Sequence, residues 1–599
     1  MIRRRIRWTP IALAMFVVFT SSLFQTLPAS AQGDGNDRHE EGRERGTTTP
    51  IKHVIVIIGE NHTFDNIFGT FQPVKGQKVN NLLSAGIVTC SGESGPNVGQ
   101  ADQQQATNTG TYSLDPTKTG PYTTLPQPDT TYAQGQPLNV PDARFPANLP
   151  NAPYQITKYV PYLNSYVGDP LHRFYQMWQQ QDEGKNDLYT WVANTAGDDN
   201  GANPPAPIHQ GALSMGYYNM CTGDAPNFNF IGHNYAISDN YHQSVMGGTG
   251  ANHIMLGTAD AAYYSDGHGN ALVPPSNQIE NPNPKPGTNN NYTQDGYAGG
   301  SYSDCSAASQ PGVGAILDYL RSLSSNPNPD CAPGHYYLLN NYAPGYTPSG
   351  QLTTSTPFAV PPQTIPSIAD KLSASGISWK YYGQGYNDAV SGQPSSFCGI
   401  CDPFQYLTSI MTTSLKNNIQ DFSNFAKDVQ NNTLPAVSFI KPDGINDGHP
   451  ASSSLSLFEA FASNIVNEVI SKREVFEDTA ILITFDEGGG YYDSGYVQPV
   501  SFFGDGSRIP LMVVSPFAKK GHVDHTYNDH VSIVKFIESN WRLLPLSQRS
   551  LDNLPNPEAE YDDPYRPTNG PAIGNLMTLF DFDRSRSQEG DTPLLPNSD

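Results

Sequence analysis

Acidic residues directly follow two strongly apolar segments of this 599-residue sequence. Residues 53–58 lead into Glu60 and Asn61, and residues 480–485 lead into Asp486 and Glu487. A carboxylate at the end of an apolar segment is rarely needed for packing, whereas two such pairs brought together would offer the oxygen ligands that hard divalent cations prefer. Helix capping is the alternative, because Asp and Asn often accept hydrogen bonds at helix starts, and spacing alone does not decide between the two.

A threonine stands among glycines in the segment from 238 to 253. Gly247, Gly248 and Gly250 surround Thr249. Glycines let a backbone approach a ligand closely, so the Thr249 hydroxyl could lie exposed beside an anion and a metal. Taken alone, such a segment is more often an ordinary turn than a nucleophile site.

Histidines provide the remaining candidates for chemistry. His172 precedes the polar stretch 184–187, His449 follows the apolar run 436–440, and His525 and His530 flank the start of a periodic apolar segment. An imidazole can carry a proton to or from a substrate near neutral pH. A single histidine is more often structural, and the chain has 14 of them, so spacing alone assigns no role.

The apolar periodicity predicts the elements that must position these groups. Residues 53–58, 436–440, 480–485 and 509–514 are apolar runs of the kind that form strands buried on both faces of a mostly parallel sheet. Pro510 cannot donate to a ladder, which predicts an edge-like start for the last run. Residues 457–472 and 531–541 repeat apolar residues at helical spacing.

Alternating strands and helices predict an α/β fold with a central, mostly parallel sheet and helices on both faces. Ligands of such sheets gather beyond the carboxyl ends of the strands, where the acids stand. We expect one domain over residues 51–583, with long ordered insertions near 76–153, 264–312 and 326–366, which are rich in Gly, Asn, Pro, Ser, Thr and Tyr. A disordered leader at 32–50 and a disordered tail at 584–599 are also expected.

The N-terminal residues predict export. Arginines at positions 3, 4, 5 and 7 precede an apolar stretch over 11–24 and small residues at 29–31, which together indicate a signal peptide over residues 1–31. A membrane anchor is the less favoured alternative, because the apolar run is shorter than the roughly 18 residues of a spanning helix. We expect a secreted or periplasmic protein without an integral membrane segment after cleavage.

Composition excludes several classes of protein. Hydrophobic residues make up 37% and charged residues 15% of the chain, which is unlike collagen, a coiled coil or a polytopic membrane protein. The net charge of −23 at pH 7 repels phosphate backbones and argues against nucleic acid as a partner. A bound cation could still recruit an anionic substrate locally.

Six cysteines in an exported chain predict disulfides, whose connectivity the sequence leaves open. They stand at positions 90, 221, 305, 331, 398 and 401. Cys398 and Cys401 have the spacing of a redox motif, yet no strand-to-helix pattern surrounds them. A small structural loop is therefore favoured over a thioredoxin-like or zinc site.

Five blocks of the sequence resemble the bacterial phospholipase C and acid phosphatase family of phosphoesterases. They fall in the family's order at residues 56–71, 238–258, 442–450, 485–493 and 510–538. The run from Glu60 to Gly69 resembles the family's opening signature, and residues 575–583 are similar to its C-terminal end. The resemblance spans nearly the whole mature chain and implies an alkaline-phosphatase-like α/β fold.

The resemblance also implies roles for individual residues. Glu60, Asn61, Asp486 and Glu487 would hold a divalent metal ion together with Thr249, which would be the nucleophile. His172 and His449 would contact the phosphoryl oxygens or the leaving group, and His335 would be a third such residue. His525 and His530 match a C-terminal pattern to which no role is assigned.

Two segments depart from the family's patterns. The phospholipase branch carries Pro-Thr-x-Pro-Asn-Arg around its nucleophile, whereas residues 248–253 read Gly-Thr-Gly-Ala-Asn-His, which looks closer to the acid phosphatase branch. Residues 492–495 read Tyr-Asp-Ser-Gly in place of Tyr-Asp-His-Val, which puts a histidine role there in doubt.

We therefore expect a secreted, metal-dependent phosphoesterase that hydrolyses small phosphate esters through a threonine nucleophile. The alternative is a phospholipase C that recognises a phospholipid headgroup and cleaves phosphatidylcholine-type diesters. A non-catalytic secreted binding protein is a more distant alternative.

Overall fold

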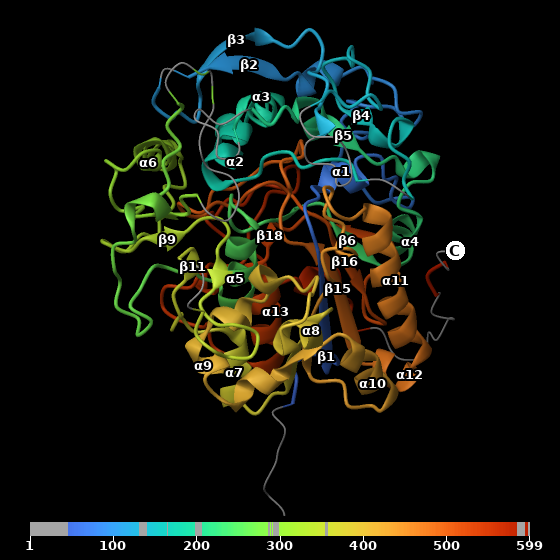
Figure 1. Cartoon of the computed structure of the whole chain (residues 1–599). Helices are drawn as coiled ribbons and strands as arrows, with labels where there is room; N and C mark the ends of the chain where they lie inside the picture. Colours follow the sequence, from blue (N-terminus) through green and yellow to red (C-terminus); the bar gives the residue numbers. More distant parts are fainter. Residues whose placement is uncertain are drawn as a thin grey trace, which may run out of the picture. The chain divides into compact units, whose positions relative to one another are not determined.

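An eight-stranded sheet forms the centre of this computed structural model (Figure 1). The structure describes residues 46–108, 110–130, 140–163, 166–197, 207–285, 288, 290, 299–353, 357–583 and 594–596. The predicted signal peptide, the predicted leader up to residue 45 and most of the predicted tail lie outside the described residues. Thr48, near the end of the predicted leader, donates its backbone N–H to Asn540 O at 2.8 Å.

The sheet is parallel except for the two pairings made by its sixth strand in spatial order, β16. In that order the strands are β13 (Ile419–Asp421), β12 (Trp379–Gly383), β14 (Val437–Lys441), β1 (His53–Gly59), β15 (Thr479–Phe485), β16 (Leu511–Val514), β6 (Ala236–Ser238) and β17 (His522–Asp524). The prediction of an α/β fold around a mostly parallel sheet is confirmed.

The four apolar runs predicted as strands form β14, β1, β15 and β16. All residues of β14, β15 and β16 are buried, as expected of strands covered on both faces. The expected edge-like start of the last strand is not observed. β16 lies between β15 and β6 and begins at Leu511, so Pro510 stays outside the ladder and removes no hydrogen bond from it.

Helices cover both faces of the sheet (Figure 1). The two predicted helical segments are α11 (Leu455–Ser471) and α13 (Val531–Trp541). α4 (Pro226–Asn234) packs on β6, β16 and α11, whereas α5 (Thr249–Thr258) packs on α13. The other helices are α1 (Phe64–Phe68), α2 (Phe174–Gln181), α3 (Tyr189–Thr195), α6 (Val313–Ser322), α7 (Ile368–Ala374), α8 (Tyr386–Ser391), α9 (Thr408–Met411), α10 (Ser423–Gln430) and α12 (Arg473–Phe476). Among the described residues, no helix combines the length and apolar character needed to cross a bilayer.

Short pairs of strands lie outside the main sheet. Most of these pairs include at least one strand from a predicted insertion. The pairs are β2 (Gln104–Thr107) with β3 (Thr117–Pro121), β4 (Tyr154–Gln155) with β5 (Gly216–Tyr217), β7 (Tyr241–His242) with β18 (Asn528–Asp529), β8 (Tyr302–Ser303) with β9 (Tyr337–Leu338), and β10 (Ala343–Pro344) with β11 (Ala359–Val360). In Figure 1, α2, α3 and β2 to β5 lie beyond the end of β1 that leads into α1. These segments therefore cover the edge of the sheet where the acids stand.

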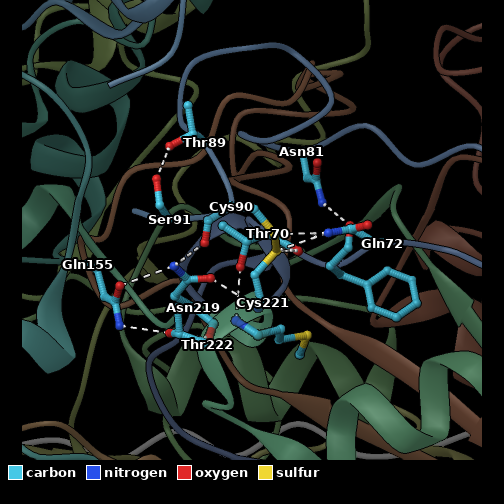
Figure 2. Close-up of a disulfide and its surroundings, with 12 residues drawn as sticks. Thr70, Gln72, Asn81, Thr89, Cys90, Ser91, Gln155, Asn219, Cys221 and Thr222 are labelled. Atoms are coloured by element: carbon cyan, nitrogen blue, oxygen red, sulfur yellow. Dashed lines mark hydrogen bonds between the residues drawn. A yellow bond between two sulfur atoms is a disulfide. The ribbon is translucent and has the colours of Figure 1, made fainter. Parts of the chain in front are cut away.

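The cysteines form three disulfides, Cys90–Cys221, Cys305–Cys331 and Cys398–Cys401. Figure 2 shows the first, which joins residues 131 positions apart. Gln72 Nε2 lies 2.9 Å from Cys90 Sγ and 3.1 Å from Cys221 Sγ, and Asn219 Nδ2 donates to Cys90 O at 3.1 Å. This disulfide fastens the segment after α1 to the segment after β5. The prediction of disulfides is confirmed.

Candidate active site

The register of the sheet brings the two acidic segments together. β1 and β15 are parallel neighbours, and Gly59 pairs with Phe485, so Glu60 and Asp486 leave the sheet at the same level. The backbone N–H groups of Asn61 and Glu487 both donate to Asp486 Oδ1, at 3.1 Å and 2.7 Å. Asn61 has a φ of 65°, a left-handed conformation that Asn tolerates better than most residues. All four side chains are buried.

Thr249 is the first residue of α5, and its side chain joins the acidic group. Thr249 Oγ1 donates a hydrogen bond of 2.9 Å to Glu487 Oε1. Gly247 is required here, because a Cβ at that position would collide with the carbonyl oxygen of Leu339. The Gly250 N–H donates to Asn341 Oδ1 at 2.7 Å, which fixes the start of the helix.

Helix capping does not account for the acids. The cap of α1 is Thr63, whose Oγ1 accepts from the Asn66 N–H at 3.1 Å. No helix begins within the segment that follows Asp486 and Glu487. The two acidic pairs therefore occupy the carboxyl edge of the sheet without serving a helix start.

Several buried polar atoms at this edge have no hydrogen-bond partner within the described part of the chain. They are Oδ1 and Nδ2 of Asn61, Oδ2 of Asp486 and Oε2 of Glu487. Buried polar groups without partners are costly, on the order of 1–3 kcal/mol each. Clustered carboxylate and amide oxygens are the ligands that hard divalent cations take. The residues present therefore fit a divalent cation.

A buried lysine balances part of the negative charge. Lys441, at the end of β14, places Nζ 2.9 Å from Glu60 Oε1 and 3.2 Å from Asp447 Oδ2. Burial acts to raise the pKa of Glu60, but the charges of Lys441 and His253 outweigh it and hold that pKa below its usual range. Glu60 is therefore an anion in the folded protein.

The other two acids have raised pKa values. Burial raises the pKa of Glu487 to about 8, with His172 opposing the shift and Glu60 adding to it. Burial, together with the charges of Glu60 and Glu487, raises the pKa of Asp486 well above its usual value. Repulsion among three buried carboxylates makes the site attractive to a cation.

His172 lies beside the acidic group, and the His449 ring lies next to His172, with ring centroids 6.4 Å apart. His172 Nδ1 donates to Pro170 O at 2.8 Å, and its Nε2 lies 3.7 Å from Glu487 Oε1. The Ala451 N–H donates to His449 Nδ1 at 3.2 Å, so a neutral His449 carries its proton on Nε2.

Asp169 lies beside both rings. Its carboxylate oxygens are 3.5 Å from His172 Nδ1 and 3.9 Å from His449 Nε2. These three residues have the composition of a metal site. The Ala451 N–H occupies the lone pair of His449 Nδ1. The nitrogen that lies toward Asp169, Nε2, therefore carries the proton in the neutral ring and has no lone pair to offer a metal. The arrangement suits proton transfer better than metal binding.

The other candidate histidines take different places. His335 packs against Tyr263 and Tyr337, and its ring is not hydrogen-bonded or ion-paired to Thr249, Glu60 or Glu487. The structure thus brings His172 to the acidic group and His449 beside His172, but it places His335 elsewhere.

The two C-terminal histidines serve different segments. His530 Nε2 donates to Phe485 O at 2.9 Å, which fixes the end of β15 directly before Asp486. Burial lowers the pKa of His530 to about 3, so the ring is neutral. His525 Nδ1 lies 2.7 Å from Asp239 Oδ1 and packs against Tyr565.

The segment at 492–495 has a structural role. Asp493 accepts from Arg508 Nε at 2.8 Å, and Ser494 N donates to Asp65 Oδ2 at 2.8 Å. Arg508 is 1% exposed and also donates to Asp65. Ser494 occupies the position of the histidine in the family pattern. This position thus lies in a buried ionic cluster rather than among the candidate catalytic residues.

Sequence reasoning missed three residues of the site, namely Asp169, Lys441 and Asp447. Lys441 directly follows the predicted strand 436–440, so the rule that ligands gather at carboxyl ends could have identified it. Asp169 stands in a stretch without apolar periodicity, and no local pattern singles it out.

Comparison with known proteins gives a family match across most of the chain. The model described as "Phosphoesterase family" matches residues 51–544. A "Probable acid phosphatase" of Kluyveromyces lactis is 28% identical over 207 residues, covering 33% of this chain and 46% of that protein. A "Hemolytic phospholipase C" of Pseudomonas aeruginosa is 27% identical over 269 residues, covering 38% of this chain and 34% of that protein.

A third relative covers more of both chains. "Phospholipase C A" of Mycobacterium tuberculosis is 22% identical over 567 residues, which is 90% of this chain and 78% of that protein. The chain therefore spans less than half the length of the first two relatives and more than three quarters of the third.

Proposed function

The chain belongs to the phosphoesterase family, and we propose that it hydrolyses phosphate esters with Thr249 as the nucleophile, at a site that holds a divalent cation. The observation that carries this proposal is the 2.9 Å hydrogen bond from Thr249 Oγ1 to Glu487 Oε1. It lies beside buried oxygens of Asn61 and Asp486 that lack a partner among the described residues. The hydroxyl, a proton acceptor and the candidate cation ligands thus occupy one place.

Glu60, Asn61, Asp486, Glu487 and Thr249 would hold the cation. When bound, it would lower the pKa of the threonine hydroxyl and neutralise charge on the phosphoryl oxygens. The oxygen ligands suit hard cations such as Mg²⁺, Ca²⁺ and Mn²⁺.

The protein's own residues supply the remaining steps. Glu487 accepts the proton of Thr249 as Oγ1 attacks phosphorus in line with the leaving group. Asn61 Nδ2 donates to a phosphoryl oxygen, and His449 Nε2–H protonates the departing alkoxide. Water then attacks the phosphothreonine and His449 takes up a proton from that water. Glu487 returns its proton to Thr249 Oγ1 as the Oγ1–P bond breaks, and phosphate leaves. His172 contacts the phosphoryl group from the side of Glu487.

Soluble phosphomonoesters are the proposed substrates. The segment Gly248–His253 is closer to the acid phosphatase branch than to the phospholipase branch, and relatives carry both names. A phospholipase C acting on phosphatidylcholine-type diesters is the second candidate, supported by the relative that covers 90% of this chain.

A comparison of two chromogenic esters tests this function. We expect hydrolysis of p-nitrophenyl phosphate to exceed that of p-nitrophenyl phosphorylcholine, and a chelator to abolish both. Faster cleavage of the phosphorylcholine ester would favour the phospholipase candidate. Full activity after exhaustive chelation would contradict the cation.

Export to an oxidising compartment is part of the proposal. It is supported by the signal-peptide pattern at residues 1–31 and by three disulfides. The net charge of −23 supports a small anionic ester, drawn in by a local cation, over nucleic acid.

A further inference from the structure

One disulfide lies against the acidic site. Cys401 is buried, and its Sγ is 3.3 Å from Glu60 Oε1. Its loop is held in place by Tyr381 Oη, which donates to Cys401 O at 3.1 Å, and by Tyr406 Oη, which donates to Ile400 O at 3.2 Å. Cys398, its partner, is partly exposed. A reductant could therefore reach the disulfide from the Cys398 side while the loop holds Cys401 beside Glu60.

A buried histidine faces the same carboxylate oxygen. His253 is 1% exposed, and its Nε2 lies 3.8 Å from Glu60 Oε1. Neither ring nitrogen of His253 has a hydrogen-bond partner in the part of the chain that the structure describes. An imidazole buried without a partner is costly. At 3.8 Å the imidazole and the Glu60 carboxylate are too far apart for a hydrogen bond, so the two groups face each other in a way that suits a shared ligand.

The three side chains have the composition of a zinc site. One ligand atom each from Glu60, His253 and Cys401 lies within 4.8 Å of the others. Carboxylate oxygen, imidazole nitrogen and thiolate sulfur are the ligands that Zn²⁺ takes in tetrahedral sites, with the fourth position open to water. A disulfide sulfur does not serve, because the thiolate is the metal ligand.

We propose that reduction of the Cys398–Cys401 disulfide opens a zinc site formed by Glu60, His253 and Cys401, and that the disulfide keeps this site closed. A dithiol supplies the two electrons: the S–S bond breaks, Cys398 and Cys401 become thiols, and the dithiol becomes a disulfide. When Zn²⁺ binds, the Cys401 thiol loses its proton to solvent as the zinc–sulfur bond forms.

The surrounding charges are compatible with the ion. The two charges of Zn²⁺ would be matched by the Glu60 carboxylate and the Cys401 thiolate. The Lys441 ammonium lies 2.9 Å from Glu60 Oε1 and 3.2 Å from Asp447 Oδ2, so Asp447 would remain its counter-ion when Glu60 binds zinc. Binding would add one net positive charge, +2 from Zn²⁺ and −1 from the Cys401 thiolate, and would leave the ion together with Glu60, Cys401, Lys441 and Asp447 neutral overall.

The zinc site shares Glu60 with the proposed hydrolytic site. Zinc held by Glu60, His253 and Cys401 would withdraw that carboxylate from the cation beside Thr249, so the reduced protein would lose hydrolytic activity in the presence of zinc. This consequence rests on the proposed function, whereas the zinc site itself does not.

Two matched variants of the full-length protein test the inference. Cys398→Ser leaves Cys401 as a permanent thiol beside Glu60, and Cys401→Ser breaks the same disulfide but leaves the thiol at Cys398. Co²⁺ replaces Zn²⁺ as a spectroscopic probe, because a cobalt–thiolate bond gives a charge-transfer absorption. We expect this band in Cys398→Ser. We also expect it in wild-type protein that has been reduced with a dithiol, once the dithiol has been removed. Neither Cys401→Ser nor oxidised wild type should show it.

Zinc titration gives the second readout. Cys398→Ser should bind Zn²⁺ roughly tenfold or more tightly than Cys401→Ser, and adding His253→Ala should remove that advantage. Equal zinc affinities, or no cobalt band in a Cys398→Ser protein with wild-type circular dichroism, would overturn the inference. Failure of wild type to hydrolyse phosphate esters would contradict the proposed function but leave the cobalt result decisive for the zinc site.

Discussion

Thr249 Oγ1 lies 2.9 Å from Glu487 Oε1, although 238 positions separate the two residues in the sequence. One residue begins α5 and the other follows β15, so the pair exists only in the folded sheet. The bond places a hydroxyl and its proton acceptor within a cluster of buried acids. We propose that the chemistry of the protein takes place at this contact.

The candidate cation ligands should be individually required for metal binding. Glu60→Gln and Asp486→Asn should each lower the bound metal measured by elemental analysis, together with the rate, because each removes an anionic ligand. Glu459→Gln is the matched control, since Glu459 and Glu60 are both 3% exposed but Glu459 contacts α4 and Tyr162 instead. Unchanged metal content in both ligand variants would contradict their assignment.

Substrate preference follows from surface charge and from the segment around Thr249. A chain with a net charge of −23 has no electrostatic attraction to anionic bilayers. We expect soluble phosphomonoesters to be hydrolysed faster than phosphatidylcholine in liposomes, as measured by released phosphate and phosphocholine. Preferential release of phosphocholine and diacylglycerol from liposomes would place the protein in the phospholipase C branch.

Glu459, a buried acid outside the candidate active site, should make the stability of the protein depend on pH. Glu459 accepts the N–H groups of Asn227 and Phe228, at 2.7 Å and 3.1 Å, and so caps α4. Burial raises the pKa of Glu459 from 4.5 to about 7, although these donors and Tyr162 oppose the shift. Between these values the folded state binds more protons than the unfolded state, so stability falls as pH rises.

The size of that effect can be measured against Glu459→Gln. Between these pH values, the titration of Glu459 should lower the free energy of unfolding of the wild-type protein by about 3 kcal/mol. Urea unfolding at pH 4.5 and pH 8 should therefore show wild type losing more stability than Glu459→Gln. Parallel losses in both proteins would show that Glu459 titrates normally.

The ionic cluster around Arg508 should be sensitive to loss of its cation. Arg508→Met would leave Asp65 and Asp493 buried without their partner, and we expect a loss of about 3–5 kcal/mol in urea unfolding. Arg566 is the matched control: its side chain is 64% exposed and lies 3.8 Å from Asp563. Arg566→Met should cost less than about 1 kcal/mol. Similar losses in the two variants would contradict this account.

The apolar runs allowed the sheet and its main helices to be predicted, because burial on both faces leaves a local pattern in the sequence. The register that pairs Gly59 with Phe485 depends on contacts between distant segments and leaves no such pattern. Asp169 reaches the site from the segment between β4 and α2, and its place is set by tertiary packing. His335 is the opposite case to Asp169. The resemblance implied a role for His335 in the site, whereas the structure places its ring against Tyr263.

Trapping the phosphorylated protein tests Thr249 as the nucleophile most directly. Wild-type protein mixed with p-nitrophenyl phosphate, quenched in acid and digested should give one phosphorylated peptide, which mass spectrometry assigns to Thr249. Thr249→Ser should retain part of the activity and carry phosphoserine, whereas folded Thr249→Ala should lose roughly a thousandfold or more of the rate and remain unlabelled. A phosphoryl group on another residue, or near wild-type turnover by Thr249→Ala, would contradict Thr249 as the nucleophile.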